Sequence, residues 1–236
     1  MVRLRVVYTI MHRYIDILRK NDLFTGICTE NIGKILDYFN AKVCVFDEDE
    51  YVFRSNHELN KIVVFIEGSA RITNADFLGN NTVLSELQSG DIFGEVHSLL
   101  PYDMPTVSVV ALSHTVVIFI DIDCILTFVP EIGDCQSQLR SNMMRIMAKK
   151  LLNNTRKLEH ISRRSTRQKL LSYFTEQMNM HQSPAFDIPF TRQQLADYLA
   201  VDRSAMSSEL SKMQKDGLIR YNLNHFELIP DSECIS

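Results

Sequence analysis

From residue 134 to residue 161 the chain contains neither proline nor glycine, and apolar side chains recur there at alternating steps of three and four residues. This spacing places them on one face of a long α-helix. The face is formed by Met144, Met147, Leu151, Leu158 and Ile161, with Asn154 in the same register. An apolar stripe of two to three heptads is typical of a helix that pairs with a second copy, and a single Asn within it fixes pairing and register. We therefore predict a dimerisation helix over residues 134–162.

The same helix carries a second apolar face, formed by Met143, Ile146 and Leu152. One face for a second copy and one for the neighbouring domain is the simplest assignment. A helix that packs only against its own domain is the alternative.

The segment before this helix has the hydrophobic pattern of β-strands. Runs rich in β-branched and aromatic residues alternate with turns that contain glycine, aspartate or asparagine. The runs are Val43–Phe46, Val52–Phe53, Ile62–Ile66, Val107–Leu112 and Thr115–Ile122. Helical spacing is found only in the first forty residues or so. Short strands about ten residues apart predict an antiparallel sandwich or barrel-like domain rather than a parallel α/β sheet.

The composition is that of an ordinary globular protein. The 236 residues are 45% hydrophobic and 23% charged with a formal net charge of -4, so any nucleic-acid surface must be a local patch. The five cysteines are scattered without a Cys-x-x-Cys pair, which argues against a disulfide framework, a zinc knuckle or a clustered iron–sulfur site. The apolar run Val6–Met11 is too short for a membrane span. We expect a cytoplasmic protein with free thiols, no metal, no cofactor and no membrane partner, starting at Met1 or Met11.

A stretch near the C-terminus contains the signals of two short helices joined by a tight turn. Thr191 followed by Gln194 matches the capping box of a helix start. Asp202 is a good N-cap for a second helix, which Gly217 ends. Ala200–Val201 forms the turn between the two helices.

The second of these helices, residues 203–215, separates apolar from polar side chains. Met206, Leu210 and Met213 lie on one face. The opposite face carries Arg203, Ser204, Ser207, Ser208 and Ser211. A hairpin over residues 219–229 follows. Helix, turn, helix and hairpin in this order predict a winged helix-turn-helix, whose second helix enters the major groove of double-stranded DNA. A helical hairpin with a polar surface is the alternative.

The order of these pieces resembles the Crp/Fnr superfamily of transcription regulators over nearly the whole chain. The matching motifs are Gly68 after a strand, Gly-Asp-Ile-Phe-Gly-Glu at 90–95, Ser-Thr-Arg-Gln-Lys-Leu-Leu at 165–171 and Thr-Arg-Gln-Gln-Leu-Ala-Asp-Tyr-Leu at 191–199. The resemblance implies an α+β chain in three parts. These are an antiparallel, jelly-roll-like β-roll sensor with N-terminal helices over 1–133, the dimerisation helix over 134–162 and the winged helix-turn-helix over 163–236. It also implies a homodimer on a two-fold symmetric operator with half-sites about 10–10.5 bp apart, and RNA polymerase as a further partner.

The resemblance assigns roles to the residues of the predicted DNA interface. Arg203 would donate to guanine O6 and N7, which is worth about 1–3 kcal/mol of discrimination, with Ser204, Ser207 and Ser208 beside it. Phosphates would be held by Thr191, Arg192, Lys212 and Lys215. Ala200 stands where the family usually has glycine, and Ser208 stands where it has a second arginine. The half-site of better-known members therefore does not transfer directly to this chain.

In family members that bind cyclic nucleotides, an Arg–Ser or Arg–Thr pair after Gly-Glu holds the phosphate. This chain keeps Gly94 and Glu95 but has Pro105–Thr106 at the place of that pair, and no Lys or Arg lies between Arg71 and Arg140. Burying a phosphate beside Glu95 without a cation is costly, which argues against cAMP and cGMP. Gly94 and Glu95 are then interpreted as structural, capping a short helix over 96–100.

The ligands that two other effectors of the family need, an iron–sulfur cluster and a haem, are missing or displaced in this sequence. Cys28 and Cys44 are too few for an N-terminal iron–sulfur cluster, and His97 is shifted by a residue from a haem-binding position. A small apolar or organic effector between the β-roll and the dimerisation helix, and a sensor that has lost its ligand, remain as hypotheses. The residues predicted for such a site are Gly94, Glu95, Pro105, Thr106, Met147, Leu151 and Leu152.

Eight Lys or Arg residues and a single acid, Glu159, lie between Lys149 and Lys169. Such a stretch attracts phosphates without reading sequence, although a solvated helix face is the simpler interpretation. A ligand-binding module whose C-terminal helices contact proteins is the competing function. No phosphate loop, metal-ligand pair or Gly-x-Ser-x-Gly motif supports an enzyme. If an effector acts, we expect the chain to pivot near Ser162–Ser165.

Overall fold

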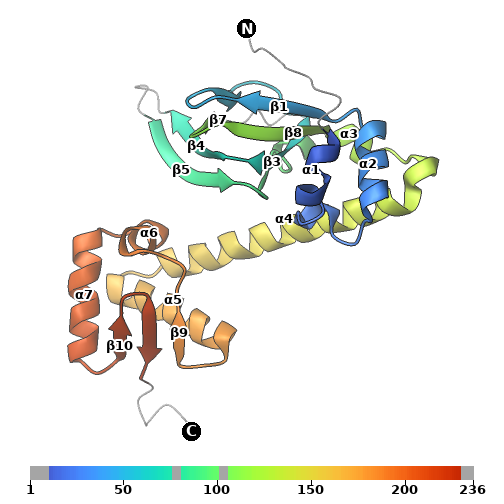
Figure 1. Ribbon diagram of the computed structural model, residues 1–236. Helices are drawn as coiled ribbons and strands as arrows, with labels where there is room; N and C mark the ends of the chain where they lie inside the picture. Colours follow the sequence, from blue (N-terminus) through green and yellow to red (C-terminus); the bar gives the residue numbers. More distant parts are fainter. Residues whose placement is uncertain (1–10, 76–80, 101–105, 230–236) are drawn as a thin grey trace. The chain divides into compact units, whose positions relative to one another are not determined.

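The computed structural model describes residues 11–75, 81–100 and 106–229. The chain folds into two compact units, residues 1–148 and 149–236. The long helix α4 (Gly133–Ile161) belongs to both, because its first half lies in the first unit and its last turns lie in the second (Figure 1). Among the described residues, no helix is long and apolar enough to cross a membrane.

Two antiparallel four-stranded sheets form the first unit. One sheet has the order β1-β8-β3-β6 and the other the order β2-β7-β4-β5. The strands of the first are β1 (Lys42–Phe46), β3 (Lys61–Glu67), β6 (Ile92–Phe93) and β8 (Thr115–Asp121). Those of the second are β2 (Tyr51–Phe53), β4 (Ser69–Ala75), β5 (Asn81–Gln88) and β7 (Val107–Ala111). The prediction of an antiparallel β-roll is confirmed.

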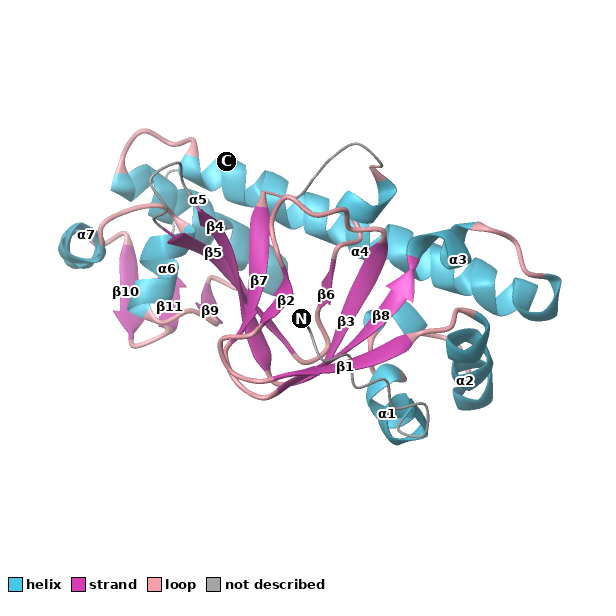
Figure 2. Ribbon diagram, turned by 90° about the horizontal axis from the view of Figure 1, so that it is seen from above, coloured by secondary structure: helices cyan, strands magenta, loops and turns pink. Residues whose placement is uncertain are grey.

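Strand β3 reads as a continuous apolar run because both of its faces are buried. Ile62, Val64 and Ile66 face a core that also contains helical residues, whereas Val63 and Phe65 face the core between the sheets. Side chains alternate across a strand, so a strand between two cores must be apolar at every position. The first unit is thus layered as helices, sheet and second sheet, with α1 and α2 beside β1 and β8 (Figure 2).

The helices of the first unit are short except for α4. They are α1 (Met11–Leu18), η2 (Asp22–Phe24), α2 (Thr29–Tyr38), η3 (His97–Leu99), α3 (Ile122–Leu126) and η4 (Pro130–Ile132). The expected helical N-terminal region is broken at Asn21, whose side chain caps η2 and donates to the Gly90 carbonyl at 2.8 Å. The helix expected over 96–100 is wrong in extent, since only a single 3-10 turn forms at η3.

The first half of α4 is fixed in this unit by both apolar and polar contacts. Leu139 and Met143 are buried in the helical core. Asn142, 2% exposed, donates through Nδ2 to the carbonyls of Leu23 at 2.9 Å and Thr25 at 2.7 Å. The buried amide therefore satisfies backbone groups of the η2 turn and sets the position of the helix on it.

The second unit combines the end of α4 with three helices and a small sheet. The helices are α5 (Thr166–His181), α6 (Arg192–Tyr198) and α7 (Arg203–Lys215). The sheet has the antiparallel order β10-β11-β9, with β9 (Ala185–Asp187), β10 (Ile219–Asn222) and β11 (His225–Leu228). Fully buried Phe174 and Leu195 lie in its core with Phe226 of the hairpin. The predicted winged helix-turn-helix is confirmed, and β9 adds a third strand that the sequence pattern did not predict.

Candidate nucleic-acid interface

Both helices of the helix-turn-helix begin at the caps expected from the sequence. The Gln194 N–H donates to the Thr191 hydroxyl at 3.3 Å, and the Thr191 N–H donates to the Gln194 side chain at 2.9 Å. Asp202 accepts from the Ala205 N–H at 2.8 Å and from the Ser204 hydroxyl at 2.5 Å. These bonds, the one from Ser204 first, lower the pKa of Asp202. The bonds from the N–H groups of Thr191, Gln194 and Ala205 satisfy backbone donors that a helix start otherwise leaves unpaired.

The turn between α6 and α7 is held by an alanine in a left-handed conformation. Ala200 has φ of 50°, a value at which glycine is strongly preferred. Lys169 of α5 donates to the carbonyls of Leu199 and Ala200, both at 3.1 Å. A cation at the end of a helix satisfies its last carbonyls, so Lys169 stabilises the turn.

Helix α7 buries one face and exposes the other. Met206, Leu210 and Met213 are at most 1% exposed. The predicted DNA-contacting residues of this helix are all exposed, namely Arg203, Ser204, Ser207, Ser208, Lys212 and Lys215. Within the part of the chain that the structure describes, the Arg203 guanidinium has no hydrogen-bond or ion-pair partner. Its donors are therefore available at the N-terminal end of the helix.

Of the four predicted phosphate ligands, Arg192 is placed differently from the others. Its Nη2 donates to the Leu223 carbonyl at 2.7 Å, and its guanidinium lies over the rings of Tyr221 at 5.1 Å and Phe226 at 4.9 Å. Burial lowers the pKa of Arg192, and its buried Nη1 has no hydrogen-bond partner. This placement leaves phosphate binding by Arg192 without support, because its guanidinium is held at the hairpin by the turn residue Leu223.

A further arginine joins the recognition helix to α5. Arg167 donates through Nε to Glu209 at 2.5 Å and pairs through Nη2 with Asp216 at 2.7 Å. Hydrogen bonds to Glu209 and then Asp216 raise the pKa of Arg167. Glu209 lies on α7 and Asp216 caps its C-terminus. The two contacts of the Arg167 guanidinium therefore fix α7 to α5.

Charge is distributed unevenly between the two units. Residues 149–236 contain 13 Lys or Arg and 10 Asp or Glu, whereas residues 1–148 contain 12 and 19. The net charges are +3 and -7, so the second unit is the basic part of an acidic chain.

The basic stretch over residues 149–169 is only partly free to bind phosphates, because Arg156, Arg167 and Lys169 have partners inside the unit. Arg163 and Arg164 are exposed, and neither side chain has a partner among the described residues.

In the first unit, Gly94 lies where no other residue fits. Its φ is 91°, and a Cβ there would lie 2.6 Å from the Lys61 carbonyl oxygen. Its own carbonyl accepts from the Ser98 N–H at 2.9 Å, and Glu95 beside it is 5% exposed. The geometry of Gly94 agrees with a structural role. Thr106 is exposed, and Pro105 lies outside the described residues.

The remaining predicted residues lie along α4. Met147 packs against the helical core of the first unit. Met144, Leu151 and Leu158 are 66%, 69% and 61% exposed and follow one another at intervals of seven residues. Of the other residues on the helix, Leu152 and Asn154 are exposed and Ile161 is half-buried. The effector site and the dimer seam stay predictions at this point.

Two family models match the chain: a cyclic nucleotide-binding domain over residues 43–130 and a Crp-like helix-turn-helix domain over residues 168–233. The chain belongs to the Crp/Fnr superfamily. It is therefore a DNA-binding transcription regulator with a cyclic-nucleotide-binding-like domain. A search of curated protein sequences gives no match.

Solved structures related to this Crp/Fnr regulator share its fold. The catabolite activator protein of Thermus thermophilus is 20% identical with a TM-score of 0.52, covering 89% of this chain and 94% of that one. The c-di-GMP responsive regulator CLP of Xanthomonas campestris is 18% identical with a TM-score of 0.55, covering 86% and 100%. CprK in complex with OCPA is 12% identical with a TM-score of 0.61, covering 83% and 90%. At these identities the likeness establishes the fold.

Several residues that shape the interface were not predicted. Sequence patterns counted Arg167 and Lys169 in a basic stretch, although both are bound to groups of the helix-turn-helix. Buried His160 and half-buried Glu176 form a pair that no motif marks. Their pairing joins side chains sixteen positions apart on two helices, and no sequence pattern marks it.

Proposed function

We propose that this Crp/Fnr regulator binds a two-fold symmetric site on double-stranded DNA as a homodimer and regulates transcription from it, with RNA polymerase as a further partner. The observation that carries the proposal is the guanidinium of Arg203, which no described residue binds. It is exposed at the N-terminal end of a helix whose opposite face is fully buried. A helix so anchored presents its first residues to base edges in the major groove.

The exposed face of α7 divides into base-reading and phosphate-binding groups. Arg203 donates to O6 and N7 of a guanine, and the Ser208 hydroxyl beside it has room for a second base contact. The Ser204 and Ser207 hydroxyls donate to Asp202 and to the Arg203 carbonyl, which leaves them as acceptors toward DNA. Phosphates are held by Thr191, Lys212 and Lys215, with Arg163 and Arg164 adding a sequence-independent attraction.

The homodimer is supported by the stripe of Met144, Leu151 and Leu158 on α4. Each of these apolar side chains is more than 60% exposed, and the spacing of seven residues is that of a coiled-coil seam. Asn154, Met147 and Ile161 lie in the same register and complete the proposed seam. Pairing would remove these apolar groups from water, which is the general driving force of such association.

The sensor is proposed to take a small organic effector other than a cyclic nucleotide, or none. Related structures include one described as responsive to c-di-GMP and one complexed with OCPA, so the effector varies among proteins of this fold. This chain has no Lys or Arg between Arg71 and Arg140 to pair with a cyclic phosphate. Within the first unit, the candidates for its lining are Gly94, Glu95, Thr106 and Met147.

The proposed DNA binding is tested by selecting bound duplexes from a random library. We expect an inverted repeat with half-sites about 10–10.5 bp apart. Arg203→Ala should lower the preference for the selected site over random DNA by about tenfold or more, since one bidentate contact is lost in each half-site. Arg19→Ala, which removes the same charge from the first unit, should leave the preference unchanged. Equal preference in the wild type and Arg203→Ala would favour a module that contacts proteins instead.

A further inference from the structure

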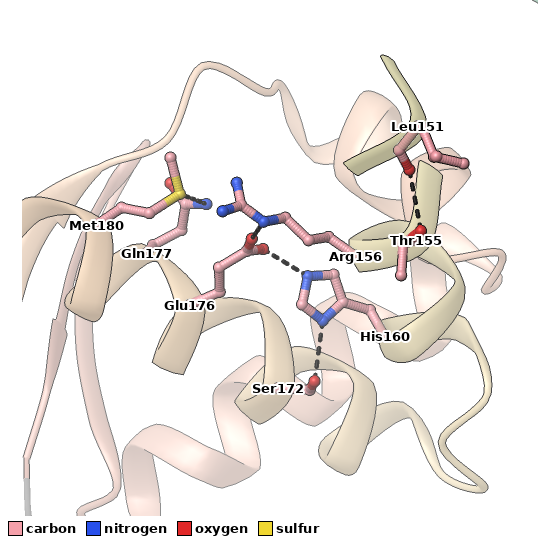
Figure 3. Close-up of polar contacts among 8 residues, drawn as sticks. All are labelled: Leu151, Thr155, Arg156, His160, Ser172, Glu176, Gln177 and Met180. Atoms are coloured by element: carbon pink, nitrogen blue, oxygen red, sulfur yellow. Dashed lines mark hydrogen bonds and ion pairs between the residues drawn. The ribbon is translucent and has the colours of Figure 1, made fainter. Parts of the chain in front are cut away.

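The last turns of α4 are joined to α5 by a partly buried polar network in the second unit (Figure 3). Each carboxylate oxygen of Glu176 on α5 contacts a side-chain nitrogen of α4. Arg156 Nε lies 3.0 Å from Oε1, and His160 Nε2 lies 2.7 Å from Oε2. The other ring nitrogen of His160, Nδ1, lies 2.9 Å from the Ser172 hydroxyl, so both nitrogens of a ring that is 3% exposed are hydrogen-bonded.

Aromatic side chains enclose this network. The His160 ring packs edge-to-face on Tyr173 at 5.7 Å and lies 6.2 Å from the ring of Tyr198 on α6. Lys157 of α4 lies over the same Tyr198 ring at 5.5 Å. Breaking a buried ion pair is costly, but forming one in place of apolar contacts adds little stability. A network of this kind therefore specifies one relative placement of two helices better than it strengthens the fold.

Helix α5 is also joined to the helix-turn-helix by polar contacts. Arg167 binds α7 through Glu209 and Asp216, and Lys169 binds the turn after α6. Polar contacts thus run without interruption from the end of α4 through α5 to the recognition helix. By contrast, the turn 162–165 that links α4 to α5 contains exposed Arg163 and Arg164, and neither side chain has a partner among the described residues.

We propose that Glu176 is a positioning residue that fixes the recognition helix relative to the end of the dimerisation helix, and so sets the half-site spacing that the dimer accepts. The inference rests on the proposed homodimer and its DNA binding. Arg156 and His160 are four residues apart and lie on one face of α4, so their simultaneous contact with one carboxylate opposes both rotation and sliding of that helix. Inserting one base pair between half-sites rotates one of them by about 35° relative to the other, so a rigid connection makes binding depend on spacing.

The test uses the full-length protein and the half-site found by selection. Duplexes carry two half-sites at the selected spacing and at spacings changed by one and two base pairs. The wild type should bind the selected spacing about tenfold more tightly than those changed by two base pairs. Glu176→Gln should reduce this ratio to about threefold or less, while its affinity for a single half-site stays within about twofold of the wild type.

Glu159→Gln is the matched control, because it also removes one carboxylate, from an exposed position in the last turns of α4. Glu159→Gln should still bind the selected spacing about tenfold more tightly than spacings changed by two base pairs. A tenfold ratio in Glu176→Gln would overturn the positioning role and leave the proposed DNA binding intact. If no sequence is selected by the wild type, the proposed function itself fails. Should Glu176→Gln not fold, Arg156→Gln, whose side chain is 36% exposed, replaces it with the same expected and overturning results.

Discussion

Ala200 holds a backbone conformation that a residue with a Cβ rarely adopts. At φ of 50° the left-handed conformation costs an L-residue about 1–2 kcal/mol, a cost that Gly avoids. The carbonyls of Leu199 and Ala200 are nevertheless satisfied by Lys169. The strain lies at the turn that orients the recognition helix, where the family usually carries glycine.

Ala200→Gly should therefore stabilise the second unit. Relief of the left-handed strain exceeds the extra entropy of glycine in the unfolded chain, for a net gain of about 0.5 kcal/mol. Urea unfolding monitored by circular dichroism measures this change. Ala205→Gly on the exposed face of α7 is the control, and it should destabilise by about 1 kcal/mol. A loss of stability in Ala200→Gly would mean that the turn carries no strain.

Asp202 makes the start of the recognition helix sensitive to acid. Hydrogen bonds from Ser204 and Ala205 lower the pKa of Asp202 in the folded protein below its ordinary value of 3.8. Stabilisation by a carboxylate with a depressed folded pKa is present above the unfolded-state pKa and is lost as the pH falls through the folded value. The wild type should exceed Asp202→Ala in stability at neutral pH, and the difference should shrink below about pH 4.

Urea unfolding from pH 7 to pH 3 measures this dependence. Asp202→Asn is the control, because asparagine caps a helix without titrating. The stability of Asp202→Asn relative to Asp202→Ala should not change with pH in this range. A gap between wild type and Asp202→Ala that is equally independent of pH would contradict the prediction.

At the scale of elements, features that depend on residues close together in the sequence could be predicted. Features that depend on contacts between distant residues could not. The caps at Thr191 and Asp202 depend on residues three positions apart, so the sequence displays them directly. Strand β9 pairs with β11 forty positions along the chain, and it is too short for its own pattern to mark it. The roles of Arg192 and His160 also depend on distant partners, which composition and spacing do not reveal.

The hairpin depends on such a distant contact. Arg192 at the start of α6 donates to Leu223 at the tip of the hairpin and lies over two of its rings. Arg192→Met should destabilise the second unit by about 1 kcal/mol, because a charge-assisted hydrogen bond and cation–π contacts outweigh the desolvation that is relieved. Urea unfolding tests this. Arg220→Met, on the same hairpin but with a side chain 71% exposed, should change stability by less than about 0.5 kcal/mol. Equal losses in the two variants would rule out a special role of Arg192.

At the scale of the whole molecule, α4 has polar anchors in both units. Asn142 fixes its first half to backbone carbonyls of the first unit, and His160 fixes its last turns to α5. Between these anchors, Leu151 presents an exposed apolar side chain. A helix held at both ends by its own chain has no need of this group for folding, which leaves it available for a second copy.

Leu151→Glu should therefore convert a dimer into a monomer without unfolding either unit. Each dimer loses two buried leucines worth about 1.5–3 kcal/mol each, which weakens self-association by more than about a hundredfold even before charge repulsion. Sedimentation equilibrium measures the change, and circular dichroism checks that the fold persists. Met180→Glu makes the same kind of exchange at an exposed position on α5 and should remain dimeric.

Because one Arg203 reads one half-site, monomeric Leu151→Glu should also bind a single half-site as the wild type does. It should lose the added affinity of the inverted repeat. A Leu151→Glu protein that stays dimeric would place the subunit interface elsewhere, and the spacing of the two recognition helices would then be set by other residues.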